Sequence, residues 1–261
     1  MTQGTILTTQ KEGTLTVTLN RPEVHNAFSD QLITDLVTCF HHIRTDEDVH
    51  VVVLTGAGKS FCAGADLNWM KQMMQYSKEQ NIEDSRTILR LYEAIVACPK
   101  PVIGRVNGPA FGGGVGLVAV CDFVVCVPEA KFGFTEVKLG LIPAVISSFV
   151  AQRLNPAAMR RFFMTGERFD AATAQAIGLV DAIAPIESMD DTIRTWCTQL
   201  RSSGPQAVGE VKALITTMLT MDSEEYKEYT VEKIAALRTS SEGQEGMGAF
   251  LEKRKPKWSD R

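Results

Sequence analysis

The chain has 261 residues, of which 44% are hydrophobic and 22% are charged, an ordinary balance for a globular protein of one large or two modest domains. Its 27 lysines and arginines against 31 aspartates and glutamates leave a net charge of −4, which argues against a nucleic-acid partner. No apolar run reaches the roughly 18 residues that a membrane helix needs. The first residues lack the basic and apolar regions of a secretory signal, so we expect a cytoplasmic protein.

The cysteines and histidines do not form a recognisable metal-binding or disulfide pattern. The six cysteines are widely spaced and include no C-x-x-C pair, which argues against a disulfide framework and against a zinc site. The four histidines all lie between residues 25 and 50 and show neither H-x-x-x-H nor H-E-x-x-H. We therefore expect no metal centre.

The first 55 residues predict a hairpin, a helix and a buried strand. Threonines alternate with apolar residues over 14–19, which predicts a half-buried strand that follows a turn at 11–13. Ser29 is placed to cap a helix. The apolar residues of that helix recur at helical spacing: Leu32, Leu36, Phe40 and Ile43. Residues 51–54 are all apolar and predict a fully buried strand.

The next segment repeats this order. Ser77 and Gln80 form a capping box at the start of a second helix. The apolar stripe expected on that helix is Ile82, Leu89, Tyr92 and Val96. Strands are predicted at 101–106 and 123–127, so strands alternate with helices from about residue 50 to 130. This alternation indicates an α/β core with its chemistry at the strand ends.

From about residue 145 the strand signals fade and helices are expected to the end of the chain. Gly204-Pro205 predicts a helix start, followed by an apolar stripe of Val208, Val211, Ile215 and Met218. Ser241 with Gln244 predicts another capping box. The C-terminal third is therefore expected to be helical.

Residues 55–60, Thr-Gly-Ala-Gly-Lys-Ser, look like a nucleotide-binding phosphate loop. A Walker A loop needs its first glycine five positions before Gly58, where Val53 stands inside the predicted strand. We therefore reject nucleotide binding at this segment.

Residues 61–67 place small residues around Gly64 just before a helical pattern. Their backbone amides either face a ligand or simply form a tight strand-to-helix turn. Cys62 has no histidine or activating charge nearby in the sequence, so we interpret it as a buried structural thiol rather than a nucleophile.

Residues 107–117 contain three consecutive glycines directly after a predicted strand. Each glycine costs up to about 1 kcal/mol relative to alanine inside a helix or strand, so the run needs a reason. Free N–H groups at a helix N-terminus offer one, because they stabilise developing negative charge on an oxygen. A dinucleotide fingerprint is excluded because Leu117 stands where the last glycine of G-x-G-x-x-G would be.

Residues 132–143 contain Glu136 as a lone carboxylate in an apolar stretch. If it is buried, its pKa rises and it is suited to moving protons beside a carbonyl. The alternative is an exposed glutamate paired with Lys138.

Together these three segments resemble the enoyl-CoA hydratase/isomerase family, the crotonase superfamily. The likeness extends over nearly the whole chain and includes Leu19-Asn20-Arg21-Pro22 near the start and residues 252–256 near the end. The resemblance implies an α/β fold, a crotonase-like spiral of β-β-α repeats followed by a C-terminal helical trimerisation region. It places the spiral core with the acyl-CoA site in residues 1–195 and the helical region in residues 196–261. It also implies a homotrimer or a dimer of trimers.

By the same resemblance the substrate is an acyl-CoA thioester, and no separate cofactor is needed because coenzyme A is part of the substrate. The backbone N–H groups of Ala65 and Gly113 would form the oxyanion site, and Glu136 would carry the proton. Lys59 and the basic residues at 253–257 would meet the coenzyme A phosphates, or are a solvated run of charge. The expected substrate-binding residues are Lys59, Ala63, Gly64, Asp66, Leu67, Gly112 and Gly116.

One departure from the family pattern bears on the reaction. Two-carboxylate hydratases of the family carry a glutamate where this chain has Gly116, so Glu136 is left as a single acid. One acid suffices to move a double bond from C3 to C2, and it can also deliver both parts of water in turn. Residues 104–109, 114–117 and 142–147 look most similar to bacterial methylglutaconyl-CoA hydratases, which serve leucine and acyclic-terpene breakdown.

We therefore expect a hydratase, with an isomerase and a non-catalytic acyl-CoA binder as alternatives. The working hypothesis for the hydratase is that a 3-methyl group eases positive charge at C3 and that the substrate's distal carboxylate places the water. Gly116 would make room for that carboxylate. Arg105 is a conceivable partner for it, but a surface ion pair is the simpler interpretation of this strand arginine.

Overall fold

The computed structural model describes residues 4–260, and within that span no helix is both long enough and apolar enough to cross a bilayer. The described strands form a six-stranded sheet in the order β1-β2-β3-β4-β6-β9 and a smaller one in the order β5-β7-β8. The large sheet consists of β1 (Ile6–Lys11), β2 (Thr14–Leu19), β3 (Val51–Gly56), β4 (Val102–Val106), β6 (Phe123–Cys126) and β9 (Ala182–Ile183). The small sheet consists of β5 (Ala110–Phe111), β7 (Lys131–Gly133) and β8 (Phe169–Asp170).

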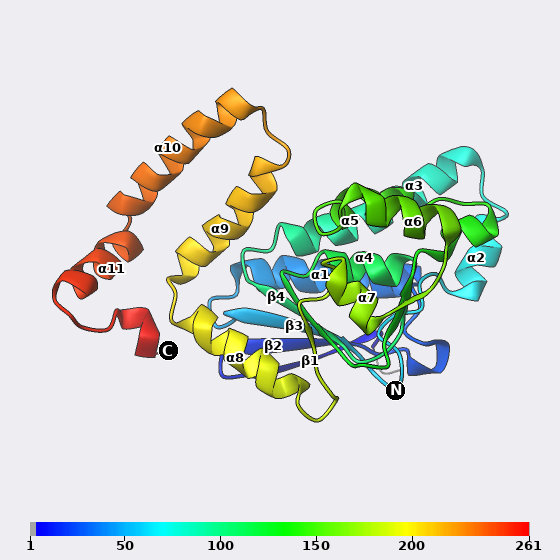
Figure 1. Cartoon of the computed structure of the whole chain (residues 1–261), viewed down its shortest axis with the longest axis horizontal. Helices are drawn as coiled ribbons and strands as arrows, with labels where there is room; N and C mark the ends of the chain where they lie inside the picture. The colour runs from blue at the N-terminus through cyan, green and yellow to red at the C-terminus, as the bar shows by residue number, and fades with distance from the viewer. Residues whose placement is uncertain (1–3, 261) are drawn as a thin grey trace.

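Helices cover the large sheet and continue beyond it as an arm (Figure 1). Those of the body are α1 (Asp30–Thr45), α2 (Leu67–Met73), α3 (Lys78–Val96), α4 (Gly113–Ala119), α5 (Ala144–Val150), α6 (Pro156–Thr165), α7 (Ala171–Ala176) and α8 (Met189–Arg201). The arm consists of α9 (Pro205–Met218), α10 (Ser223–Thr239) and α11 (Ser241–Leu251). Short 3-10 turns occur at Pro22–Val24, Thr135–Leu139 and Lys257–Asp260.

The predicted N-terminal hairpin is confirmed. Strands β1 and β2 pair antiparallel, with Lys11 opposite Thr14. The remaining neighbours in the large sheet are all parallel. In a parallel sheet the carboxyl ends of the strands meet at one edge, so the loops after β3 and β4 emerge side by side.

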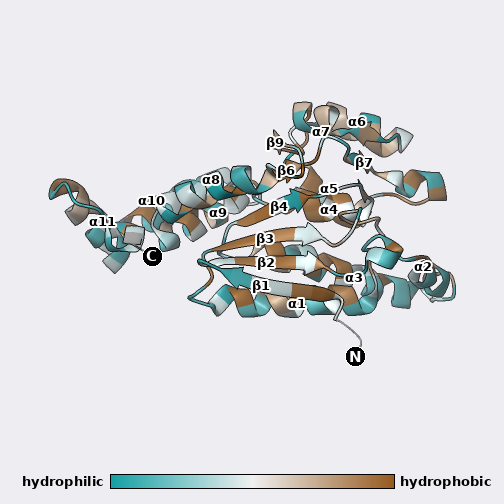
Figure 2. Ribbon diagram, turned by 90° about the horizontal axis from the view of Figure 1, so that it is seen from below, coloured by the Kyte–Doolittle hydropathy of each residue, from teal (hydrophilic) through white to brown (hydrophobic). Residues whose placement is uncertain are grey.

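The core lies between this sheet and the helices above it. All six residues of β3 are buried, as predicted for a strand covered on both faces. Figure 2 shows hydrophobic residues concentrated on β3 and β4. Ser29 caps α1 by accepting a hydrogen bond from Leu32 N, and the predicted apolar stripe of α1 is buried.

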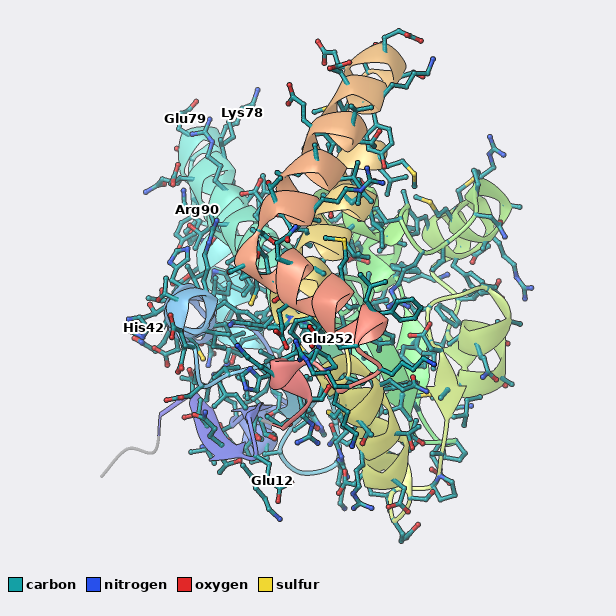
Figure 3. The ribbon with its side chains drawn as sticks, turned by 90° about the vertical axis from the view of Figure 1, so that its left-hand side faces the viewer. Glu12, His42, Lys78, Glu79, Arg90 and Glu252 are labelled. Atoms are coloured by element: carbon teal, nitrogen blue, oxygen red, sulfur yellow. The ribbon has the colours of Figure 1, made fainter. Side chains whose placement is uncertain are left out.

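The face of α3 differs from the predicted stripe. The capping box of Ser77 and Gln80 is confirmed, but the fully buried residues are Leu91, Tyr92 and Ile95. Ile82 is 42% exposed, because the first turns of α3 project beyond the sheet. Charged side chains such as Lys78, Glu79 and Arg90 point outward from this helix (Figure 3).

The second half of the chain is not purely helical. Two short strands, β8 and β9, were not predicted, and each has only two residues, which is too short to show an alternation. Helix α8 packs on the sheet face opposite α4, where Arg105 of β4 reaches it. The expected boundary between residues 195 and 196 falls inside α8.

Polar contacts fix the arm to the body and hold its helices together. Lys212 of α9 forms an ion pair with Asp122 at 2.8 Å. Within the arm, the Glu242 side chain of α11 accepts hydrogen bonds from Gln206 N and Ala207 N at the start of α9. The predicted start of α9 at Gly204-Pro205 is confirmed.

The cap of α11 was predicted one residue too late. Ser240, not Ser241, accepts the hydrogen bond, from Gly243 N. Gln244 does not complete a box, because its side chain donates to Arg238 O instead.

Candidate active site

Three segments that are far apart in the sequence lie beside one another at the carboxyl edge of the large sheet. Phe111 N donates to Cys62 O at 3.0 Å, which joins the loop after β3 to β5. Strand β5 in turn pairs with β7, and Gly112 N donates to Gly133 O at 2.9 Å. The structure thus brings together the three segments that the sequence singled out, 61–67, 107–117 and 132–143.

The N–H groups of Ala65 and Gly113 are both unused within residues 4–260. The residues around Ala65 are tied to Phe28, which donates to Gly64 O and accepts from Asp66 N. In this parallel bridge the N–H of Ala65 points away from Phe28. Gly113 is the first residue of α4, where a helix has no acceptor of its own for the N–H. Ala65 is exposed and Gly113 half-buried, so both can be reached by a ligand.

Glu136 lies next to Gly112, the residue that precedes Gly113. A Cβ atom placed on Gly112 would be 3.3 Å from Glu136 Oε1, so the carboxyl group lies against the turn that begins α4. The Oε2 atom is buried and has no hydrogen-bond partner. Burial therefore raises the pKa of Glu136. The alternative of an exposed ion pair with Lys138 is not what the structure shows, since the ion pairs of the described chain do not include one for Glu136.

Gly116 lies one turn into α4 and is fully buried. A Cβ atom there would be 2.5 Å from Ile146 Cγ2 and 2.7 Å from the Tyr92 hydroxyl oxygen. The position of the missing second carboxylate is therefore filled by Tyr92 and Ile146. The hypothesis that Gly116 makes room for a substrate carboxylate is wrong, because neighbouring side chains already occupy that space.

Gly112 and Gly64 have structural reasons to be glycine. Gly112 has φ 51° and ψ −122°, a conformation that side chains rarely adopt. Gly64 has φ 91°, and a Cβ on it would lie 2.9 Å from Phe111 O. Both glycines let the two loops approach closely.

The remaining predicted binding residues differ in what they contact. Ala63 donates its N–H to His25 O, and Leu67 is 74% exposed at the start of α2. Lys59 is exposed on the turn after β3. Arg254 of the basic tail is held in an ion pair with Glu245 at 2.6 Å.

Asp66 is buried and its carboxylate is already engaged within the protein. It accepts from Asn68 N at 2.7 Å and pairs with Arg21 at 2.7 Å. Although burial alone raises the pKa of Asp66, these hydrogen bonds and the Arg21 charge outweigh it and the pKa is lowered. Asp66 thus stays ionised and fixes the loop that carries Ala65.

Cys62 is a structural thiol and Arg105 forms an ion pair, as the simpler interpretations of these residues predicted. Cys62 is fully buried, and burial raises its pKa to about 12, so it is an unreactive thiol at neutral pH. Arg105 pairs with Asp190 at 2.8 Å on the face of the sheet that α8 covers. In the part of the chain that the structure describes, no cluster of histidine, cysteine or acidic side chains is arranged to hold a metal ion.

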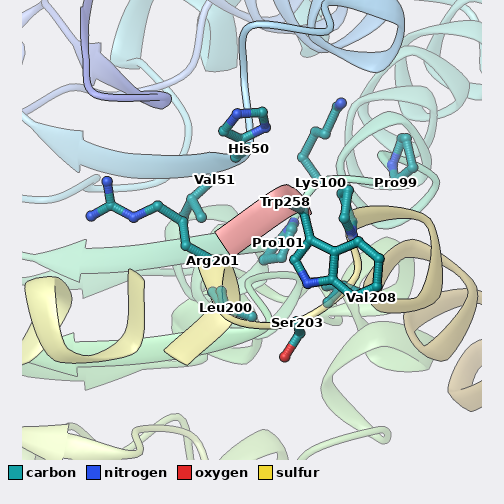
Figure 4. Close-up of a pocket in the computed structure, with 11 residues that line it drawn as sticks. His50, Val51, Pro99, Lys100, Pro101, Leu200, Arg201, Ser203, Val208 and Trp258 are labelled. Carbon is teal, nitrogen blue, oxygen red and sulfur yellow. The ribbon is translucent and has the colours of Figure 1, made fainter. Parts of the chain in front are cut away.

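A cavity at the opposite edge of the sheet is distinct from this site. It is lined by Val51 at the start of β3, by Pro101 just before β4 and by Trp258 of the C-terminal turn (Figure 4). Its volume is about 40 Å³, which is enough for little more than water. It is therefore not a candidate for an acyl-CoA site.

Tyr92 is a residue whose place in the site was not foreseen. It was predicted only as part of an apolar helix stripe, yet its hydroxyl donates to Gly113 O at 2.8 Å. A tyrosine in an apolar stripe is compatible with ordinary core packing, so the sequence offers no signal for this contact.

Known proteins resemble this chain over most of its length. A sequence model described as enoyl-CoA hydratase/isomerase matches residues 9–261. An enoyl-CoA hydratase of Alternaria alternata is 35% identical over 249 residues, which cover 94% of this chain and 81% of that protein.

Solved structures are similar over almost their whole length. An enoyl-CoA hydratase from Shewanella pealeana has a TM-score of 0.92 at 37% identity, covering 97% of this chain and 96% of that one. One from Mycobacterium smegmatis has a TM-score of 0.91 at 32% identity, covering 98% of this chain and 99% of that one. The chain therefore belongs to the enoyl-CoA hydratase/isomerase family and is an enzyme with the crotonase fold.

Proposed function

We propose that this enzyme adds water across the 2,3 double bond of a branched enoyl-CoA such as 3-methylglutaconyl-CoA. The observation that carries the proposal is the Glu136 carboxyl group, whose Oε2 is buried and unpartnered and whose Oε1 lies against the turn at Gly112, just before the Gly113 N–H. An acid in this environment needs a partner, and a substrate or its attacking water is the partner that the site would receive.

In the proposed reaction Glu136 acts first as base and then as acid. Its carboxylate takes a proton from water while the water oxygen bonds to C3, and the electrons of the double bond move onto the thioester oxygen. The Ala65 and Gly113 N–H groups donate to that oxygen, which is worth about 3 kcal/mol of barrier per donor. Glu136 then returns the proton to C2, so that one water molecule is added in all.

A single acid suits a substrate that carries a methyl group at C3. The methyl group stabilises positive charge at C3 and so lowers the demand on the base that activates water. The distal carboxylate of a methylglutaconyl group would help to orient the water. Because Tyr92 and Ile146 fill the space beside Gly116, that carboxylate would have to lie elsewhere in the site.

A second candidate reaction is the isomerisation of a 3-enoyl-CoA to a 2-enoyl-CoA. The space beside Gly116 favours this reaction, because Tyr92 and Ile146 leave no room there for a second carboxylate and isomerisation needs only one. Glu136 would remove a proton from C2 and return it at C4, and the N–H groups of Ala65 and Gly113 would hold the dienolate between the two steps.

The experiment that separates these reactions offers the purified protein 3-methylglutaconyl-CoA, crotonyl-CoA and a 3-enoyl-CoA, and follows enoyl absorbance and product mass. A product heavier by one water supports the hydratase. A shifted double bond without added mass supports the isomerase, and acyl-CoA binding without turnover supports a non-catalytic binder.

Glu136→Gln tests the role of the acid in whichever reaction is found. We expect kcat to fall at least about 100-fold while the affinity for acyl-CoA stays the same, because the amide can neither take nor return a proton. Glu129→Gln, a change at an exposed glutamate before β7, is the matched control and should retain full activity. Wild-type turnover by Glu136→Gln would remove Glu136 from the mechanism.

The proposal also covers the cofactor, the oligomeric state, the pathway and the location of the enzyme. The substrate supplies coenzyme A, so the reaction needs no further cofactor, and Lys59 is proposed to meet the coenzyme A phosphates. We propose a homotrimer or a dimer of trimers, and a place in leucine breakdown. All six cysteines are free thiols, which supports a cytoplasmic location, where thiols stay reduced.

A further inference from the structure

Tyr92 is a buried phenol to which the proposed reaction assigns no part. It comes from α3 and is completely inaccessible to solvent. Its ring packs against Phe149 of α5 with ring centroids 5.4 Å apart, and its hydroxyl reaches the first residue of α4. Tyr92 therefore connects three helices at the point where the oxyanion site begins.

The hydroxyl of Tyr92 has a single hydrogen, and its donation to Gly113 O at 2.8 Å uses that hydrogen. Glu136 consequently receives no hydrogen bond from it, in agreement with the unpartnered Oε2. Burial raises the pKa of Tyr92 well above its ordinary value, and the nearby Cys62 and Glu136 add to this effect. Tyr92 thus stays a neutral donor at any pH at which Glu136 titrates.

Gly113 has no side chain to fix its conformation, although its N–H must keep one direction to stabilise an oxyanion. The Tyr92 hydroxyl would be 3.1 Å from a Cβ placed on Gly113, and Phe28 would be 2.5 Å from the same atom. The residue is thus enclosed by two aromatic side chains, of which Tyr92 also binds its carbonyl oxygen.

We propose that Tyr92 is a positioning residue, which holds Gly113 so that its N–H stays aimed at the thioester oxygen and which occupies the space that a second carboxylate at position 116 would need. The inference rests on the proposed function, because it assigns Gly113 to the oxyanion site. It explains how the site keeps an ordered donor while it works with Glu136 alone.

The test is Tyr92→Phe, which keeps the ring on Phe149 and removes the hydroxyl. With the best substrate found above, we expect kcat to fall about tenfold at an unchanged KM, because the bond to be lost orients a donor used in the transition state. Binding of acetoacetyl-CoA gives a second readout, since the ultraviolet band of its enolate reports oxyanion stabilisation directly. That band should weaken while total affinity for the ligand is kept.

Tyr226→Phe removes a phenolic hydroxyl from α10 in the arm and should change neither quantity. Unchanged kcat and enolate band in a folded Tyr92→Phe protein would overturn the proposal, and so would a fall in kcat that is matched by the same loss of acyl-CoA affinity.

If Tyr92→Phe does not fold, a fluorinated tyrosine at position 92 strengthens the donor without changing the shape. The enolate band should then increase, and an unchanged band would overturn the proposal.

A wild-type protein without turnover on any of the three substrates would count against the proposed function instead. The enolate band can still be measured in that case, so the two failures are distinguishable.

Discussion

Glu136 combines a place beside the oxyanion turn with an environment that disfavours its charge. Because burial raises its pKa, the carboxylate is a stronger base than that of an exposed glutamate, and a pKa closer to neutral pH suits a group that must both take a proton and give it back. The activity should therefore rise with pH through a value above the ordinary 4.5 of a glutamate. A profile of kcat/KM against pH measures the pKa of this rise in activity. A rise at the ordinary glutamate pKa would show that Glu136 is exposed to water in the free enzyme.

The same shift makes a prediction for stability. The folded protein binds the Glu136 proton more tightly than the unfolded chain, so this group destabilises the fold as pH rises from 4.5 through its raised folded-state pKa. Glu136→Gln removes the titration. We expect the Tm of Glu136→Gln to exceed that of the wild type increasingly as pH rises through this window. Equal pH dependence of the two Tm values would contradict the burial of the carboxyl group.

Gly112 offers a test of the turn itself. Its φ of 51° strains any side chain, and a Cβ would also lie 3.3 Å from Glu136 Oε1. Gly112→Ala should lower the free energy of unfolding by roughly 1–3 kcal/mol and also reduce kcat. Gly140→Ala is the matched control, because Gly140 has a φ of 73° but nothing within 4 Å of its Cβ. Gly140→Ala should cost stability alone, and equal losses of kcat in both variants would argue against a special role for Gly112.

At this scale the sequence singled out three segments, and the structure brings them together, while the roles of Ala65, Gly113 and Glu136 stay predictions. Each of these segments lies in a loop that follows a strand, so their meeting at the ends of the strands is foreseeable. The role of Tyr92 was not, because it depends on how α3 packs over α4. The lack of space beside Gly116 could not be predicted either, because it depends on the same packing, which places Tyr92 and Ile146 against this glycine.

At the scale of elements, the arm begins with an unusual cap. Gly204, which precedes α9, has no side chain to accept a hydrogen bond, and Glu242 from α11 takes that place with both carboxylate oxygens. A negative group at a helix N-terminus is also favoured by the helix dipole. The start of α9 is therefore stabilised from across the arm.

Glu242→Ala should destabilise the contact between α11 and the start of α9. We expect about 1 kcal/mol lower stability and faster hydrogen exchange at the N–H groups of Gln206 and Ala207, which lose their acceptor. Glu228→Ala, at an exposed position of α10, should leave those exchange rates as they are. Unchanged exchange in Glu242→Ala would show that the cap does not persist in solution.

Local rules predicted the caps at Ser29 and Ser77, because each lies just before a helix with a clear apolar period. The rule failed at 240–241, where two serines are adjacent and only the geometry decides between them. It could not foresee Glu242 at α9, since that acceptor is 36 residues away from Gln206. Caps within one turn are local, whereas caps supplied by another helix are not.

At the scale of the whole molecule, one ion pair joins the arm to the body. Lys212 Nζ reaches Asp122 Oδ2 at 2.8 Å and also donates to Ile95 O at 3.3 Å. Both side chains are mostly buried, and Asp122 also accepts from Val102 N at the start of β4. The contact therefore links α9, the end of α3 and the sheet.

Lys212→Met should leave Asp122 as a half-buried charge without its cation. We expect the free energy of unfolding to fall by roughly 1–3 kcal/mol. Lys227→Met removes an exposed lysine that pairs with Glu224 on α10 and should cost less than about 0.5 kcal/mol. Denaturant unfolding of both variants makes the comparison. Equal losses would mean that Lys212 does not anchor the arm.

The class of fold could be predicted from alternating strands and helices, and the arm from its helical stripes. The separate β5-β7-β8 sheet could not, because each of its strands has two or three residues and their pairing is set by the chain's path. The apolar stripe predicted on α9 is a second feature that the sequence could not place against a partner. Val211 and Ile215 are 54% and 53% exposed, so a helical period alone does not say what covers it.

That exposure supports the proposed trimer. Phe250 and Leu251 at the end of α11 are 83% and 79% exposed, and together with Val211 and Ile215 of α9 they expose large apolar side chains on the arm, as a surface that another chain covers would. Sedimentation should find particles of three or six times the chain mass of 28.6 kDa. Phe250→Ser with Leu251→Ser should shift them toward monomers, whereas Leu7→Ser in β1, 43% exposed and far from the arm, should not. A wild-type protein that sediments as a monomer at micromolar concentration would contradict the trimer and leave the apolar arm without a partner.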